Sequence, residues 1–132
     1  MDHTADFGLR VFGDNAKDLF QNAAMALMEQ LVETVDLLAR EKRRIAIQGN
    51  DWPDLLVNWL REILYLWVGE DVFAQSIQIE SITEKRLTAH LWVDPFSSER
   101  HNLISEIKAV TYHQVQVFES ANRWEAKVIF DI

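Results

Sequence analysis

Apolar side chains recur at helical spacing in two stretches of the chain. In residues 19–31 and again in residues 55–67, apolar positions fall three or four residues apart. That spacing gathers them on one face of a helix and leaves the polar positions on the other face. The pattern therefore predicts two amphipathic helices.

Residues at the borders of these stretches are typical of helix ends. Asp14 or Asn15 can cap the first helix, because a short polar side chain accepts a hydrogen bond from a free backbone N–H. Asp51 can cap the second, with Pro53 in the first turn, where the missing N–H costs little. Gly69 is placed to end it.

Alternating apolar and polar positions predict β-strands over most of the remaining chain. Asp94-Pro95 breaks one of these patterns, and residues 34–38 fit neither a helix nor a strand. Two helices packed on a mostly antiparallel sheet would bury all the apolar faces, which predicts a single α+β domain over residues 1–132. The predicted strands lie at residues 6–12, 45–47, 76–80, 87–93, 115–117 and 124–132.

Composition narrows the classes of function. The chain has 132 residues and no cysteine, which excludes disulfides, thiolate zinc sites and a cysteine nucleophile. The 13 basic and 21 acidic residues give a net charge of −8, which disfavours tight, unassisted binding to nucleic acid. The longest apolar run, residues 63–68, is too short to span a membrane. The N-terminus lacks the basic and apolar regions of a signal peptide, so we expect a cytoplasmic protein.

The first candidate for a functional site lies at the N-terminus. Asp2, His3 and Asp6 bring two carboxylates and an imidazole together within five residues. Such a group can hold a hard cation through oxygen or a transition metal through nitrogen. The alternative is a solvated chain end with aspartate as a turn former, and the spacing alone favours this alternative.

The second candidate lies at the C-terminus. Alternation directs Phe130 and Ile132 into the core and Asp131 away from it. An anchored Ile132 would fix its terminal carboxylate beside Asp131, and together they would supply two oxygen ligands for a cation. An ordinary strand end with a solvated terminus is the alternative.

The third candidate is the segment 108–113. Lys108 lies between two apolar residues and is either an exposed strand residue or a cation presented to a partner. His113 is either a ligand or base, or a structural histidine. The sequence contains no glycine-rich phosphate loop, no G-x-S-x-G motif and no H-E-x-x-H motif. These residues alone indicate a soluble α+β domain of unknown role.

Taken in order, these segments resemble the archease family over essentially the whole chain. They are Asp-His-Thr-Ala-Asp at 2–6, Asp-Leu-Leu-Val-Asn-Trp-Leu-Arg-Glu-Ile-Leu-Tyr-Leu at 54–66, Lys-Ala-Val-Thr-Tyr-His at 108–113 and Val-Ile-Phe-Asp-Ile at 128–132. In this sequence Met1 directly precedes the first motif, where family members usually have several residues of a strand. A trimmed chain, a late start and a missing strand all remain open.

The resemblance implies a function in RNA processing. Archeases are cytoplasmic cofactors of the RtcB-type RNA ligase of tRNA splicing, which joins a 2′,3′-cyclic phosphate or 3′-phosphate end to a 5′-hydroxyl. They are thought to promote charging of that ligase with GMP and to allow multiple turnovers without joining RNA themselves. The resemblance therefore implies an activator rather than an enzyme, which reaches RNA only through the ligase and needs no membrane.

The resemblance also implies a set of site residues. The family's metal site corresponds to Asp6 and Asp131, with the terminal carboxylate of Ile132 as a third oxygen donor and calcium as the expected divalent cation. Its important lysine corresponds to Lys108. His3 and His113 match further family positions as supporting residues.

Two other functions fit the sequence. One is a chaperone-like modulator of another RNA-modifying enzyme, such as a tRNA cytosine methyltransferase, since some archeases have been linked with such enzymes. The other is a small metal-dependent hydrolase built on Asp6, Asp131 and His3, although no nucleophile or general base stands out.

Overall fold

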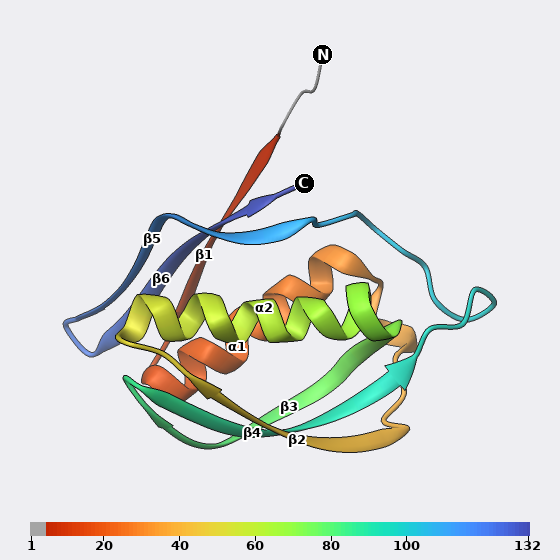
Figure 1. Ribbon diagram of the computed structural model, residues 1–132, viewed down its shortest axis with the longest axis horizontal. Coiled ribbons are helices and arrows are strands. Elements are labelled where there is room, and N and C mark those ends of the chain that lie inside the picture. The colour runs from red at the N-terminus through yellow and green to blue at the C-terminus, as the bar shows by residue number, and fades with distance from the viewer. Residues whose placement is uncertain (1–4) are drawn as a thin grey trace.

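Two helices lie between two three-stranded antiparallel sheets (Figure 1). The first sheet has the strand order β1-β6-β5 and the second the order β2-β4-β3. The structure is a computed structural model that describes residues 5–132. Its elements are β1 (Asp6–Gly13), α1 (Ala16–Leu31), a short 3₁₀ helix η1 (Thr34–Asp36), β2 (Glu41–Gln48), α2 (Trp52–Glu70), β3 (Val72–Thr83), β4 (Arg86–Pro95), β5 (Ala109–Ser120) and β6 (Arg123–Asp131).

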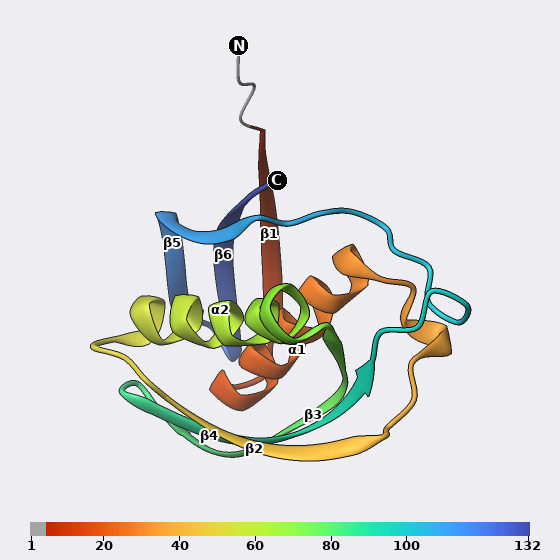
Figure 2. The ribbon, with the colours of Figure 1, turned by 45° about the vertical axis from the view of Figure 1, so that its right-hand side comes forward.

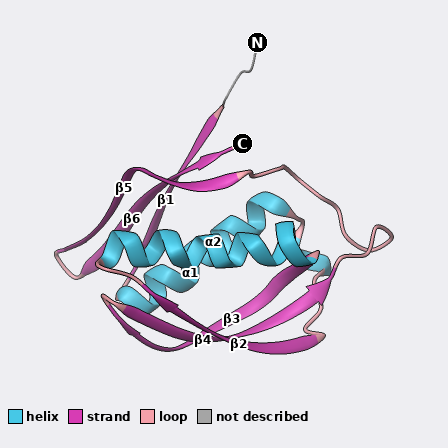
Figure 3. Ribbon diagram, viewed as in Figure 1, coloured by secondary structure: helices cyan, strands magenta, loops and turns pink. Residues whose placement is uncertain are grey.

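The predicted fold class is confirmed, and the structure adds that the strands divide between two sheets. Both helices contact strands of both sheets, so that one layer of helices is covered on two sides (Figure 2). Alternation within one strand identifies its apolar face but does not say which other strand will lie beside it. The secondary-structure colouring shows the two helices between the strands of the two sheets (Figure 3). No helix among residues 5–132 is long and apolar enough to cross a membrane.

The helix starts agree with the sequence prediction. The side chain of Asn15 accepts a hydrogen bond of 2.8 Å from the Asp18 N–H, and that of Asp51 accepts one of 2.9 Å from the Asp54 N–H. The predicted stop at Gly69 is wrong, because α2 continues to Glu70. Asp71 takes the left-handed conformation there, with φ of 56°, and closes the helix.

A close contact explains the glycine at position 69. A Cβ at Gly69 would lie 2.3 Å from Cε2 of Tyr65, which is too close for two non-bonded carbon atoms, so the exposed Tyr65 ring would have to turn away. Gly69 therefore makes room for the ring of Tyr65 one turn earlier.

The core fills the space between the helices and the two sheets. Trp59 is its largest fully buried side chain and lies at the centre of α2. Its indole N–H donates a hydrogen bond of 2.9 Å to the backbone oxygen of Phe20 in α1, so it joins the two helices through packing and through a polar contact. A buried indole N–H without such a partner would be costly.

A buried carboxylate holds the long segment that follows β4. The sequence pattern breaks at Asp94-Pro95, and β4 does end there, at Pro95; the pattern did not show that Asp94 is completely buried. Its side chain accepts two hydrogen bonds from Arg100, at 2.9 and 3.0 Å, and one of 2.9 Å from the Leu38 N–H. His101 contacts it at 2.9 Å through Nε2. Asp94 thus joins the segment after η1 to the segment after β4.

These contacts explain why a carboxylate is tolerated there. Burial by itself raises the pKa of Asp94, but the hydrogen bonds from Arg100, from the Leu38 N–H and from His101 outweigh it and lower that pKa to about 2. Nδ1 of His101 accepts a hydrogen bond of 2.9 Å from the Ser97 N–H, so Nε2 carries the proton that His101 donates to Asp94.

Candidate functional site

The first and last strands of the described chain pair with each other and bring two carboxylates together. Strands β1 and β6 are antiparallel, and their register sets Asp6 directly opposite Asp131. The Ile132 N–H donates a hydrogen bond of 3.1 Å to the Ala5 oxygen. Asp6 and Asp131 therefore form a non-hydrogen-bonded pair of the two strands. In such a pair the facing side chains approach each other most closely.

This arrangement is electrostatically unfavourable without a counter-charge. Like charges directly opposite each other in a sheet are destabilising. Among residues 5–132, no basic side chain forms an ion pair with Asp6 or Asp131. Asp6 is exposed and Asp131 is partly exposed, so solvent ions can reach both. A pair of accessible carboxylates on adjacent strands fits a hard divalent cation, which prefers oxygen ligands.

Two side chains do not complete a metal site by themselves. Within the described part of the chain, no three His, Cys, Asp or Glu side chains gather closely enough to hold a metal ion. A cation held there would need further oxygen ligands, and the terminal carboxylate of Ile132 is next to Asp131 in the chain. His3, the predicted supporting residue, lies outside the described residues, as does Asp2.

The prediction that Ile132 inserts into the core is wrong. Its relative exposure is 38%, whereas Phe130, two residues earlier, is completely buried. Strand β6 ends at Asp131, and the C-terminus projects beyond the helices that cover the rest of the sheet (Figure 1). The residue is nevertheless tied down through the backbone by its hydrogen bond to Ala5.

Lys108 lies beside the carboxylate pair. Its backbone N–H donates a hydrogen bond of 2.7 Å to the backbone oxygen of Asp131. The next residue, Ala109, lies on β5 opposite Asp131. Lys108 is exposed. The sheet order β1-β6-β5 therefore joins Asp6, Asp131 and Lys108 at one corner of the first sheet, although they come from three separate parts of the sequence.

His113 does not join this corner. It is exposed and lies where the pairing of β5 with β6 is irregular, between Thr111 and Gln116. Four residues of extended chain separate it from Ala109, which amounts to roughly 13 Å. Its N–H donates to the Thr111 hydroxyl at 3.2 Å. The family match at this position thus has no contact with the carboxylate pair to support it.

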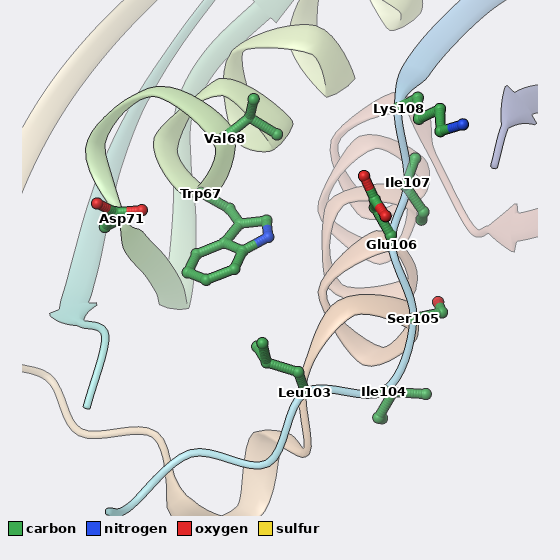
Figure 4. Close-up of a pocket in the computed structure, with 9 residues that line it drawn as sticks. All are labelled: Trp67, Val68, Asp71, Leu103, Ile104, Ser105, Glu106, Ile107 and Lys108. Carbon is green, nitrogen blue, oxygen red and sulfur yellow. The ribbon is translucent and has the colours of Figure 1, made fainter. Parts of the chain in front are cut away.

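An apolar groove that the sequence analysis missed begins at Lys108. A hollow of about 680 Å³ lies between the end of α2 and the segment 103–108 (Figure 4). A second of about 360 Å³ lies along α2 towards β5. Both include Val68 and Lys108, and we call them together the α2 groove. Val68 and Tyr65, with relative exposures of 62% and 54%, lie outside the apolar stripe of α2, and that position is the signal in the sequence.

Apolar side chains lie on both sides of the groove, among polar ones such as Asp71 and Glu106. Leu103 and Ile104 line it opposite α2 and are also about half exposed. Trp67 points into the hollow, whereas the amine of Lys108 extends away from Trp67 on the far side of the segment (Figure 4). Four exposed large apolar side chains around one groove are typical of a surface that binds another macromolecule.

The fold and this corner define a small α+β domain whose first and last strands pair and present two facing carboxylates. A family model described as the Archease protein family (MTH1598/TM1083) matches residues 1–132. The archease of Methanosarcina mazei is 32% identical over 136 residues, covering all of this chain and 93% of that protein. The archease of Sulfurisphaera tokodaii is 31% identical and covers 99% of this chain and 95% of its own length. The chain therefore belongs to the archease family.

Solved structures agree with that assignment. Protein 1598 of Methanobacterium thermoautotrophicum superposes with a TM-score of 0.81 at 30% identity, covering all of this chain and 96% of its own. A Thermotoga maritima protein described as an archease and "possible chaperone" superposes with a TM-score of 0.69 and covers 94% of its own chain. At 18% identity, the second supports the fold alone. No enzyme family is indicated by these matches.

Proposed function

We propose that this chain is a protein cofactor that activates an RtcB-type RNA ligase by promoting its guanylylation and multiple turnover. The observation that carries the proposal is the corner of the first sheet, where Asp6, Asp131 and Lys108 meet. These are the residues that the family resemblance assigns to metal binding and activation. In this proposal the protein is cytoplasmic and is not itself an enzyme, because the joining chemistry belongs to the ligase.

A divalent cation, with calcium as the expected one, is part of the proposal. The side chains of Asp6 and Asp131 and the terminal carboxylate of Ile132 would be its oxygen ligands. When bound, the cation supplies concentrated positive charge that attracts phosphate oxygens. The support is electrostatic, since two facing carboxylates without a basic partner in the described chain are stabilised by a cation and destabilised without one.

Lys108 and the α2 groove are the parts of the proposal that concern the partner. The groove offers apolar surface of the kind that protein partners cover, and it reaches the residue that stands beside Asp131. A ligase that docked in the groove would therefore also lie close to the carboxylate pair. The net charge of −8 would attract a basic, RNA-binding partner.

A ligase assay tests the proposal. The cognate ligase is incubated with GTP and manganese, and its guanylylation is measured with and without this protein. We expect stimulation by the wild-type chain and loss of most of it in Asp131→Asn. The matched control is Glu84→Gln, which neutralises an exposed carboxylate in the turn between β3 and β4 of the other sheet. No stimulation by the wild-type chain contradicts the proposal.

The second candidate is a chaperone-like modulator of another RNA-modifying enzyme, such as a tRNA cytosine methyltransferase. The exposed apolar groove favours it, because such a surface is not specific to a ligase. The similar Thermotoga maritima protein is also described as a "possible chaperone". Competition between purified ligase and purified methyltransferase for the immobilised chain separates the two candidates, since the true partner displaces the other.

A further inference from the structure

A group of cations and aromatic rings lies on the outer face of the first sheet. The register sets Phe12 of β1 and Phe118 of β5 on either side of Glu125 of β6, in one row across the three strands. Facing residues of paired strands project from the same side of a sheet. The relative exposures of Phe12 and Phe118 are 37% and 41%, so both side chains are partly exposed to solvent.

Arginine side chains stack on one of these rings. The guanidinium carbon of Arg123 lies 4.3 Å from the centre of the Phe12 ring, and that of Arg10 lies 5.7 Å from it. Both guanidinium groups also face Glu125, at 2.6 Å for Arg10 and 4.0 Å for Arg123. Glu125 therefore holds the two arginines in place while their outer surfaces stay exposed.

The local charge has the opposite sign to that of the whole protein. Lys127, the register partner of both Arg10 and Gln116, adds a third cation in the next row of the same face. Glu125 is the one carboxylate in these two rows. Arg10, Arg123 and Lys127 thus leave a positive surface on a chain whose net charge is −8.

We propose that this surface, made of Phe12, Phe118, Arg10, Arg123 and Lys127, binds single-stranded RNA. An open sheet face with aromatic rings for bases and cations for phosphates is a common way of binding unpaired strands. The choice of RNA over DNA rests on the proposed function. A protein partner is the less suitable occupant, because none of the exposed aliphatic side chains of the described chain belongs to these two rows. They are Val68, Leu103 and Ile104 at the α2 groove, Val35 and Leu38 around η1, and Ile132 at the C-terminus.

Direct contact with RNA differs from the expectation that this chain reaches RNA only through the ligase. The acidic remainder of the chain limits the affinity, so we expect a Kd of about 10⁻⁴ M, at the weak end of non-specific binding. Such binding would guide a strand that the ligase already holds. Phe12 and Asp6 belong to the same face of β1, six residues apart, or roughly 20 Å. A strand on this surface would therefore lie on the face that ends at the carboxylate pair.

Fluorescence anisotropy of a labelled, unstructured RNA of about 12 nucleotides, at about 50 mM salt, tests the inference. We expect Phe118→Ala and Phe118→Leu each to weaken binding about 5-fold or more, because both remove the ring and the second keeps apolar volume. Lys127→Ala should weaken binding and flatten its salt dependence by about one counter-ion. The controls Lys85→Ala and Tyr65→Ala, at exposed positions away from this surface, should bind like the wild type.

The outcomes separate this inference from the proposed function. Guanylylation is measured without RNA, so stimulation there should survive Phe118→Leu even where RNA binding is lost. The inference is overturned by absence of binding at about 50 mM salt, by equal binding of a double-stranded RNA, or by equal losses in Lys85→Ala and Lys127→Ala. Loss of ligase binding in Phe118→Leu, without loss of RNA binding, makes this face a protein interface and also overturns it.

Discussion

Asp6 and Asp131 face each other across β1 and β6 at a position where their backbone groups do not pair, so their side chains are the closest that two strands allow. Antiparallel pairing of the first and last strands produces this relationship. It places two like charges together at the cost of some stability, which a bound cation would restore.

Neutralising one of the two carboxylates should have opposite effects with and without the cation. Asp131→Asn should weaken calcium binding about 10-fold or more, because it removes one of few charged ligands. In the presence of chelator, the free energy of unfolding of the same variant should equal that of the wild type or exceed it by about 0.2–1 kcal/mol, because the repulsion from Asp6 is relieved. Titration calorimetry and urea unfolding measure the two effects. Destabilisation in chelator would show that Asp131 has a structural role instead.

Lengthening the chain by one residue tests the terminal carboxylate. Ile132 is tied to Ala5 by its N–H, so an added glycine would move the carboxylate away by about 3.3 Å while leaving both aspartates in place. We expect weaker binding of calcium with unchanged thermal stability, measured by calorimetry and by circular dichroism. Equal affinities of the extended and original chains would remove Ile132 from the site.

Replacing Lys108 should separate activation from folding. Its side chain is exposed and its structural hydrogen bond is made by the backbone, so Lys108→Ala should change the free energy of unfolding by about 0.5 kcal/mol or less. We expect the variant to lose most of the stimulation of ligase guanylylation. Lys85→Ala, an exposed lysine in the turn after β3, is the matched control and should stimulate normally. Full stimulation by Lys108→Ala would leave the lysine without a role.

Much of the fold could be predicted because its signals are local. The apolar spacing identified both helices, and Asp51 and Asn15 act as the caps that their side chains allow. The α2 groove was missed because the apolar stripe of a helix identifies its buried residues. Val68 lies outside that stripe, and it marks the groove because it is an apolar side chain that stays exposed. Alternation alone does not show what covers a given face.

The errors have the same physical cause. Alternation indicated that Ile132 faces the core, but at that point the strand extends past the helices and no core remains to receive it. The break in the pattern at Asp94-Pro95 marks the true end of β4, but it does not show that Asp94 is buried, because Arg100 and His101 return from the next segment to stabilise that carboxylate. For the site, sequence suggested Asp6, Asp131 and Lys108 through resemblance, and the register of three strands explains why they lie together.

The buried Asp94 should make stability depend on pH in the acid range. Its pKa is about 2 in the folded protein against an ordinary value of 3.8 for aspartate, so the folded state favours the ionised form. This contribution, roughly 2 kcal/mol, is fully present above about pH 4 and is lost as the pH falls towards 2. Asp94→Asn should therefore be less stable than the wild type at neutral pH by about 2 kcal/mol or more, since Arg100 loses its charged partner.

The difference between the two proteins should then shrink as the pH falls, because protonation neutralises Asp94 in the wild type as well. Urea unfolding at neutral pH and at about pH 3 measures it, with both proteins followed in parallel. The control is Asp54→Asn, which neutralises a partly exposed carboxylate whose pKa is lowered chiefly by a hydrogen bond from Tyr112. It should cost far less at neutral pH, because an exposed pair contributes little. A loss in Asp94→Asn that is the same at both pH values would mean that the shape of the side chain matters and its charge does not.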